Sequence, residues 1–272
     1  MLRFSTTLTE LFLSAWRHRR LIFQFARREV EGRYRGSYLG LLWSFASPLA
    51  MLAVYTLFFG VIMQSRWGAN IVNTTDFAIN LFAGLIVFNL FSEIVSRAPG
   101  LILSNASYVK RVVFPLEILP WSAMLGALFH LSVSLGILLA AHLATGGALH
   151  PTLLLLPLIL APFALLLLGL GWFLAATGTY IRDIGQLVGM VQTALLFLSP
   201  VFYPVSSLGP GMQFWLNLNP LTFIIEAFRS VTLRGETPDW HSLVAYWMLG
   251  MAVSWLGFVW FQKTRKGFSD VV

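Results

Sequence analysis

The chain has 272 residues, of which 57% are hydrophobic and 11% are charged, and its formal net charge is +7. Soluble domains carry about 25% charged residues, so this composition excludes a soluble globular protein and indicates an integral membrane protein. The positive charges lie at the ends of apolar segments and form no basic face with interleaved aromatics, so we do not expect nucleic acid as a partner. The chain has no cysteine, which excludes disulfides and thiolate metal sites.

The first forty residues hold eight arginines and no apolar run typical of a cleavable signal peptide, so we expect none. Apolar side chains at helical spacing predict one amphipathic helix, too short in its apolar face to span a membrane. These residues are Phe12, Trp16, Phe23, Ala26, Val30 and Tyr34. Such a helix anchors on the inner leaflet. Glu29 and Glu31 favour a second role, the binding of a cytoplasmic partner, since acidic residues gain little beside anionic lipid.

Six apolar segments are each long enough for a bilayer core, which takes about 20 helical residues. They are Leu41–Met63, Phe77–Ser96, Leu116–Ala144, Leu153–Thr179, Ile184–Val205 and Ser242–Phe261. With six spans both termini lie on one side, and that side holds fifteen Lys and Arg residues against three on the other. By the positive-inside rule, we predict an all-α, multi-pass membrane protein with both termini in the cytoplasm.

We predict one transmembrane domain over residues 1–272. Its parts are a cytoplasmic arm at 1–40, five spans within 41–205, an external segment at 206–241, a sixth span at 242–262 and a cytoplasmic tail at 263–272. The external segment contains one short apolar run, Phe223–Phe228, and is interrupted by Pro210 and Pro220. We expect two short helices there, in or on the outer leaflet and held by the bundle.

The sequence contains no energy source of its own. None of the three lysines lies in a phosphate-binding G-x-x-x-x-G-K-[ST] loop. Ion-coupled carriers usually hold ionisable groups at the membrane midplane, and here only His130 lies near the middle of a span. We interpret it as hydrogen-bonded packing. Glu93 and Arg97, four residues apart at a helix end, predict a structural ion pair. Clustered carboxylates and histidine ligand spacing are absent from the sequence, which excludes most catalysis. We therefore expect a passive pathway driven from outside.

Two of the predicted spans have a face that could line such a pathway. In the fifth span Gly185, Gly189, Gln192, Ser199 and Tyr203 fall near one face, and in the first span Trp43, Ser47, Tyr55 and Phe58 do. Aromatic faces can stack on sugar rings. The spacing of the two glycines equally predicts helix packing, and aromatics at span ends are ordinary interface anchors.

Several stretches resemble, in order, the permease subunit of bacterial ABC exporters for polysaccharides of the O-antigen, capsule and teichoic acid type. They are RYRGSYLGLLWSFASPLAMLAVYTLFFGVI (33–62), YVKRVVFPLEILP (108–120), IRDIGQ (181–186), LSPVFYP (198–204) and NPLTFIIEAFR (219–229). The resemblance covers nearly the whole chain, and the O-antigen branch fits best.

The resemblance implies a channel-forming homodimer of six-span subunits in the bacterial inner membrane, with two ATPase subunits beneath it. The cargo would be a polysaccharide linked to undecaprenyl diphosphate. ATP and Mg would be bound by the ATPases, and this chain would bind no cofactor or metal.

By the same resemblance, a group of charged residues faces the ATPases, and we expect the arm to pass their movement through Gly36 and Gly40 to the first span. This group is Arg27, Arg28, Glu29, Glu31, Arg33, Arg35, Arg97, Lys110, Arg111, Arg182 and Asp183. Glu226 and Arg229 belong to the external helices at the channel exit. The expected channel residues are Trp43, Tyr55, Phe58, Gln192, Ser199 and Tyr203.

Two alternatives remain open from the sequence. One is an ABC permease for another cargo, such as teichoic acid, capsule, a drug or a lipid. The other is a channel outside the ABC class, which would conduct in a bilayer without an ATPase.

Overall fold

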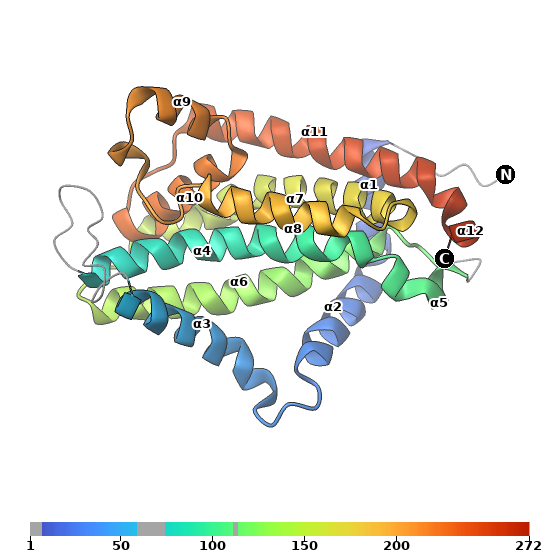
Figure 1. The fold of residues 1–272 in the computed structure, drawn as a ribbon, viewed down its shortest axis with the longest axis horizontal. Helices are drawn as coiled ribbons and strands as arrows, with labels where there is room; N and C mark the ends of the chain where they lie inside the picture. Colours follow the sequence, from blue (N-terminus) through green and yellow to red (C-terminus); the bar gives the residue numbers. More distant parts are fainter. Residues whose placement is uncertain (1–6, 59–73, 111–113, 272) are drawn as a thin grey trace.

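A computed structural model describes residues 7–58, 74–110 and 114–271, and throughout these residues the regular structure is helical (Figure 1). Four helices are long and apolar enough to cross a membrane. They are α4 (Thr74–Arg97), α6 (Ile118–Ala144), α7 (Leu156–Tyr180) and α11 (Trp240–Thr264). The expected all-helical membrane fold is thereby confirmed, and these helices match the second, third, fourth and sixth predicted spans. Met63, Arg66 and Arg111 lie outside the described residues.

The other α-helices are shorter and are joined by 3₁₀ and π turns. They are α1 (Leu8–Arg17), α2 (Arg19–Tyr34), α3 (Trp43–Tyr55), α5 (Ala106–Val109), α8 (Ile184–Phe197), α9 (Pro210–Asn217), α10 (Pro220–Arg229) and α12 (Phe268–Val271). α8 coincides with the fifth predicted span but ends well before Val205, so the predicted helix end is wrong. Pro200 explains this early end, because proline disfavours helical backbone in the residue before it. The 14 residues of α8 give a length of about 21 Å, shorter than a bilayer core.

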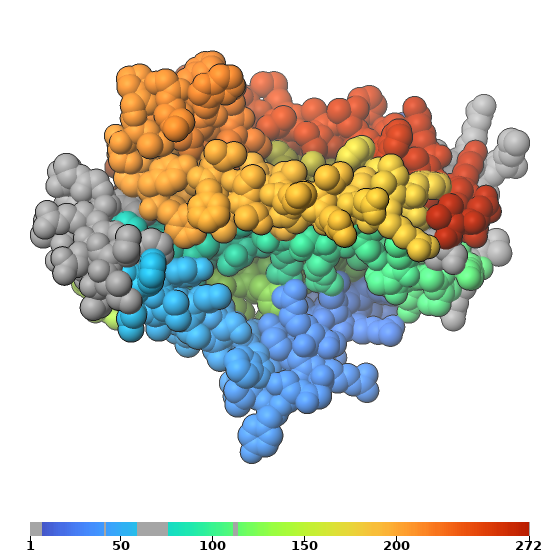
Figure 2. Space-filling model, viewed as in Figure 1, coloured from blue at the N-terminus to red at the C-terminus, as the bar shows by residue number. Residues whose placement is uncertain are grey.

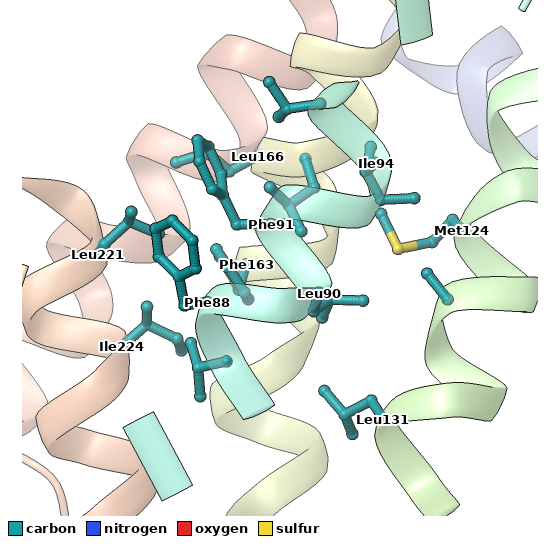
Figure 3. Packing of buried hydrophobic residues seen from close by; sticks show 14 of the residues in the cluster. Phe88, Leu90, Phe91, Ile94, Met124, Leu131, Phe163, Leu166, Leu221 and Ile224 are labelled. Atoms are coloured by element: carbon teal, nitrogen blue, oxygen red, sulfur yellow. The ribbon is translucent and has the colours of Figure 1, made fainter. Parts of the chain in front are cut away.

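The centre of the bundle is α4, the most deeply buried of the four long helices. Figure 3 shows Phe88, Leu90, Phe91 and Ile94 of α4 between side chains of three other helices. Those side chains are Met124 and Leu131 of α6, Phe163 and Leu166 of α7, and Leu221 and Ile224 of α10. Because lipid tails are as apolar as these side chains, close packing holds such helices together more than the hydrophobic effect does.

The closest helix contact joins α7 to α11 through small residues. A Cβ at Gly257 of α11 would overlap the Gly169 carbonyl of α7, and a Cβ at Gly250 would overlap the carbonyl of Pro162. Both helices use a seven-residue spacing, and the contacts advance in the same direction along each, so α7 and α11 run parallel. The backbones approach each other only because these positions lack side chains.

The remaining long helices follow a regular alternation of direction. α7 also runs parallel to α4, since Gly171 lies beside Ile94 and Gly178 beside Pro99. α6 runs opposite to α4, with Met124 near Ile94 and Leu131 towards Leu90 (Figure 3). Between the parallel α7 and α11, the chain must return from one end of the bundle to the other, and α8 runs back along α4 (Figure 1).

The glycine contact between α7 and α11 leads to a stability prediction. Gly257→Ala forces the two backbones apart, so we expect a loss of about 1–3 kcal/mol, typical of overpacked sites, and a lower Tm of the detergent-solubilised protein. Gly136→Ala on α6 is the matched control, because a Cβ there meets no atom within 4 Å. Equal Tm values for the two variants would contradict the close contact.

Candidate functional site

The N-terminal arm forms two helices instead of the single predicted one, because the backbone at His18 leaves helical geometry (φ −103°, ψ 15°). This break changes which residues face the bundle. The buried arm residues are Leu11, Ser14, Ile22 and Ala26. Phe12, Trp16 and Phe23 are 41–68% exposed, so half of the predicted apolar face points outward. The arm therefore has one side that packs on the bundle, mainly on α6, and a separate exposed side with aromatic residues, the arrangement of an interfacial helix.

Two ion pairs, side by side, join the end of the arm to α4. Glu29 of α2 pairs with Arg97 of α4, and Arg33 of α2 pairs with Glu93 of α4 at 2.8 Å. On each helix the acid and the base are four residues apart and thus on one face. The Glu93 side chain is only 14% exposed. Burial raises the pKa of Glu29, and the neighbouring Arg97 opposes that effect. We call these four residues the arm clamp.

His130 of α6 joins the arm clamp to a third helix. Its Nδ1 lies 3.1 Å from both carboxylate oxygens of Glu93 and 2.9 Å from Nη1 of Arg33, and its Nε2 lies 3.3 Å from the Tyr34 hydroxyl. In the tautomer with a proton on Nδ1, the ring donates to Glu93 and accepts from Tyr34. The predicted hydrogen-bonded packing of His130 is thus confirmed, and the predicted Glu93–Arg97 pair, at 3.6 Å, is one part of a larger network.

A second polar junction joins elements that sequence reasoning left apart. Glu117, which precedes α6, binds Arg265 of the tail at 2.5 Å and accepts a hydrogen bond from Ser14 of α1 at 3.3 Å. Arg265 also donates to the Phe114 carbonyl at 2.6 Å. From the sequence, Arg265 was only one of the fifteen Lys and Arg residues that indicated the membrane orientation. The signal for Glu117 was an acidic residue between prolines in the apolar stretch FPLEILP.

The structure divides the predicted ATPase-facing residues into two groups. Glu29, Arg33 and Arg97 belong to the arm clamp, although the Arg33 side chain is still 42% exposed, and their place on a docking surface stays a prediction. The others that the structure describes are exposed, and among them Arg27 pairs with Glu31 at 2.7 Å. The exposed group is Arg27, Arg28, Glu31, Arg35, Lys110, Arg182 and Asp183. Arg28 also donates to the Tyr108 hydroxyl at 3.1 Å.

The predicted channel residues lie in different parts of the structure. Trp43, 43% exposed, lines a polar cavity of about 370 Å³ between α2, α3, α4 and α6. Gln192 of α8 donates to the carbonyl and hydroxyl oxygens of Ser92, both at 2.7 Å, and Ser92 lines the same cavity. Tyr55 is half-buried, Phe58 is exposed, and Tyr203 is half-buried and donates to the Phe197 carbonyl.

Ser199 does not belong with the other channel candidates. It is fully buried, and its hydroxyl accepts a hydrogen bond from Nδ2 of Asn219 at 2.9 Å. The helical spacing that placed it on the channel face fails because α8 ends at Phe197. The prediction for Ser199 is therefore wrong, and its observed role is to hold the end of α8 against the external segment.

The external segment contains the two short helices that the sequence predicted, α9 and α10. Asn219 begins α10: its side-chain oxygen accepts from the Leu221 N–H at 3.0 Å, and Pro220 occupies the first helical position. Both are standard start signals for a helix. The apolar run of the segment lies within α10, which packs against α4.

Arg229 is the most buried charge among the described residues, with 0% exposure. Its guanidinium donates to the carbonyls of Asn80, Pro200 and Val201 at 2.6–2.9 Å and to the Glu226 carboxylate at 2.9 Å. Burial lowers the pKa of Arg229 to about 10, so it stays charged at neutral pH. A Cβ at Gly84 of α4 would overlap this group. Arg229 lies on α10, one of the two short helices predicted for the external segment, and ties it to α4 and to the segment after α8.

Removal of Arg229 should destabilise the protein strongly. Arg229→Met leaves buried carbonyls and the Glu226 carboxylate without their donor, and we expect a loss of about 3–5 kcal/mol in stability, measured by thermal unfolding in detergent. Arg234→Met is the control. Arg234 binds the same Glu226 at 2.9 Å but is 39% exposed, so about 0–1 kcal/mol is expected. A similar small loss for both variants would contradict the buried network.

No group of three His, Asp or Glu side chains suited to a metal ion occurs in the described ranges 7–58, 74–110 and 114–271. The polar groups of this site instead connect helices: the arm clamp and the Glu117 junction lie where the arm and tail meet the bundle, and Arg229 lies towards the opposite end of α4. Between them lies the polar cavity. This arrangement can transmit movement and contact a polar ligand.

The sequence is similar to those of known membrane transport proteins. An O-antigen export system permease protein, RfbA of Myxococcus xanthus, is 27% identical over 94% of this chain and 97% of its own length. RfbA of Klebsiella pneumoniae is 20% identical over 93% and 95%. The polysialic acid transport protein KpsM of Escherichia coli is 26% identical over 88% and 91%. The model of the ABC-2 type transporter family matches residues 20–233, and the chain belongs to this family of membrane transport proteins.

Proposed function

We propose that this chain is the permease subunit of an ATP-driven exporter that moves lipid-linked polysaccharide across the bacterial inner membrane. The observation that carries the proposal is the match to O-antigen export permeases along more than nine-tenths of both chains. Relatives named for polysialic acid transport and capsule polysaccharide export match over 88% and 92% of this chain. The cargo we propose is O-antigen carried on undecaprenyl diphosphate.

We propose six spans, with α3 and α8 as the first and fifth and both termini in the cytoplasm. The alternating directions of α4, α6, α7, α8 and α11 support this topology. α8 is short for a full crossing, but the polar turn after it is covered by the external segment, and irregular backbone at membrane depth requires such cover. The excess of Lys and Arg on the side of the arm and tail gives the orientation.

The subunit works as a homodimer in this proposal, with α3 and α8 facing the partner copy and the channel. Many large apolar side chains of these helices are exposed in the single chain, and Figure 2 shows α8 lying across the near face of the molecule. They include Phe45, Leu49, Met51 and Val54 of α3 and Leu187, Met190 and Val191 of α8. Gly185 and Gly189 are the smallest of the exposed positions, and a Cβ at either would meet no atom within 4 Å beyond their own helix backbone.

ATP hydrolysis, with its Mg, belongs to two partner ATPase subunits, because this sequence has no nucleotide-binding loop. The exposed charges Arg27, Arg28, Glu31 and Arg35 of the arm supply the docking surface, together with Lys110, Arg182 and Asp183. The arm clamp then passes movement of the arm directly into α4. Gly36 and Gly40, at φ +86° and +51°, form the turn that also connects the arm to α3.

The composition of the purified complex tests this function. We expect the tagged protein, extracted gently from its native membrane, to have the mass of two copies of this chain with two copies of a Walker-motif ATPase. Cells that lack the chain should retain polysaccharide inside and lose it from the surface. A stable ATPase-free protein that conducts ions in a planar bilayer would contradict the proposal and favour a channel.

Charge exchange tests the arm clamp as the coupling element. Glu29→Arg sets two arginines against each other, and we expect on the order of 2 kcal/mol of destabilisation, between the values for exposed and buried pairs. Export of surface polysaccharide should fall while the protein still inserts. The double variant Glu29→Arg/Arg97→Glu restores opposite charges and should recover export.

The matched control for this exchange is Arg17→Glu, which breaks the exposed pair between Arg17 and Glu10 on the arm (3.4 Å). It should change export little. If the double variant exports no better than Glu29→Arg alone, the pair does not act as a clamp, and coupling must follow another route.

A further inference from the structure

We infer that the polar cavity between α2, α3, α4 and α6 is a binding site for a neutral sugar ring of the cargo. The inference rests on the proposed function, since it names what one site does in polysaccharide export. The cavity has a volume of about 370 Å³ and opens at the surface beside the arm, where Figure 2 shows the molecule hollowed between α2 and α3. It adjoins the arm clamp, since Arg33, Glu93 and Arg97 line it.

One wall of the cavity is a polar stripe on the most buried helix. Asn89, Ser92, Glu93 and Ser96 of α4 recur at spacings of three and four and share one face. Asn89 and Ser96 are exposed, although α4 is otherwise almost entirely buried. An exposed amide or hydroxyl facing lipid tails is costly. This face of α4 is therefore built to meet water or a polar ligand.

The charges of the cavity favour a ligand without net charge. Arg33 and Arg97 are balanced by Glu93, which lines the cavity, and by Glu29 behind Arg97. A diphosphate would be repelled by Glu93, and a cation by the two arginines. A carboxylate, two guanidinium groups, an amide and several hydroxyls together offer both donors and acceptors. Sugar hydroxyls, each donor and acceptor at once, match such a set.

An aromatic side chain completes the site. Trp43 at the start of α3 is partly exposed and lines the same cavity, opposite the stripe of α4. Sugar rings have an apolar C–H face as well as a polar rim, so a flat apolar surface beside converging polar groups fits a ring in one orientation. Ser44, Ser47 and Ser134 add hydroxyls to the lining from α3 and α6.

Photo-crosslinking in intact cells tests the site with the complete complex. The probe is a benzophenone amino acid placed at Ser134, in the cavity, or at Ser132, two residues away on the same helix. Two residues turn a helix by about 200°, and Ser132 is exposed and absent from the cavity lining. We expect irradiation to attach polysaccharide at position 134, seen as a mass shift that a glycan antibody detects, with at least a tenfold lower yield at 132.

A second pair of variants tests the polar stripe itself. Asn89→Leu combined with the probe at 134 should lower the polysaccharide adduct at least fivefold, whereas Ser132→Val should leave it unchanged. The probe at Ser47 serves as a second position within the cavity, and the yield of purified complex shows which variants fold.

The outcomes separate this inference from the proposed function. If removal of the chain stops export but folded protein with the probe at 134 and at 47 gives no polysaccharide adduct, the cavity inference is overturned and the function stands. Adducts with ordinary phospholipid at both 134 and 132 overturn it too. If export does not depend on this chain, the proposed function itself fails.

Discussion

The two ion pairs between α2 and α4 constrain the position of the arm on the bundle. The apolar contact of the arm with the bundle is made by buried Leu11, Ile22 and Ala26 and by the ring of Phe25, which packs against Tyr108 and Phe114. Charges taken out of water cost several kcal/mol each unless they are paired and hydrogen-bonded. Glu29 and Glu93 each pair with an arginine of the facing helix, and His130 adds a hydrogen bond to Glu93, so these pairs favour the observed position of the arm beside α4.

The opposite half of α4 carries a similar constraint. Arg229 donates to the carbonyl of Asn80 there, while Glu93 and Arg97 lie at the other end of the same helix. The 13 residues from Asn80 to Glu93 correspond to about 20 Å of helix. A single rigid element thus joins the arm to the external helices, and the polar stripe lies along it. Displacement of the arm would reach α10 without passing through a loop.

The sequence predicts the long elements well because helix length and hydrophobicity are local properties. α4, α6, α7 and α11 follow from apolar runs alone, and α10 from Asn219, Pro220 and a short apolar stretch. The early end of α8 also has a local signal, Pro200, which the apolar run around it obscures. The break at His18 has none that we can identify.

The site was less predictable, because its partners are distant in the chain. Arg229 and Asn80 are 149 residues apart, and Arg265 and Glu117 are 148 apart. Hydropathy assigns such arginines to solvent or to topology, since it reads one segment at a time. Glu29 was expected at a docking surface because an acid gains little beside anionic lipid, and no local pattern pointed to a partner within the chain. Only the packing of α2 on α6, which brings its charged side chains beside α4, reveals that the partner of Glu29 is Arg97.

The order of charges in the arm clamp also restricts how the arm can move. Along α2 an acid precedes a base, and along the facing stretch of α4 an acid again precedes a base. The two stretches are antiparallel, so each acid faces a base. A slide of one helical turn, about 5.4 Å, would bring Glu29 opposite Glu93 or Arg33 opposite Arg97. Like charges would then face each other in a partly buried place. The ion pairs therefore favour one register of α2 relative to α4. The arm can rotate about this contact or separate from α4, but a shift along α4 is opposed by like charges.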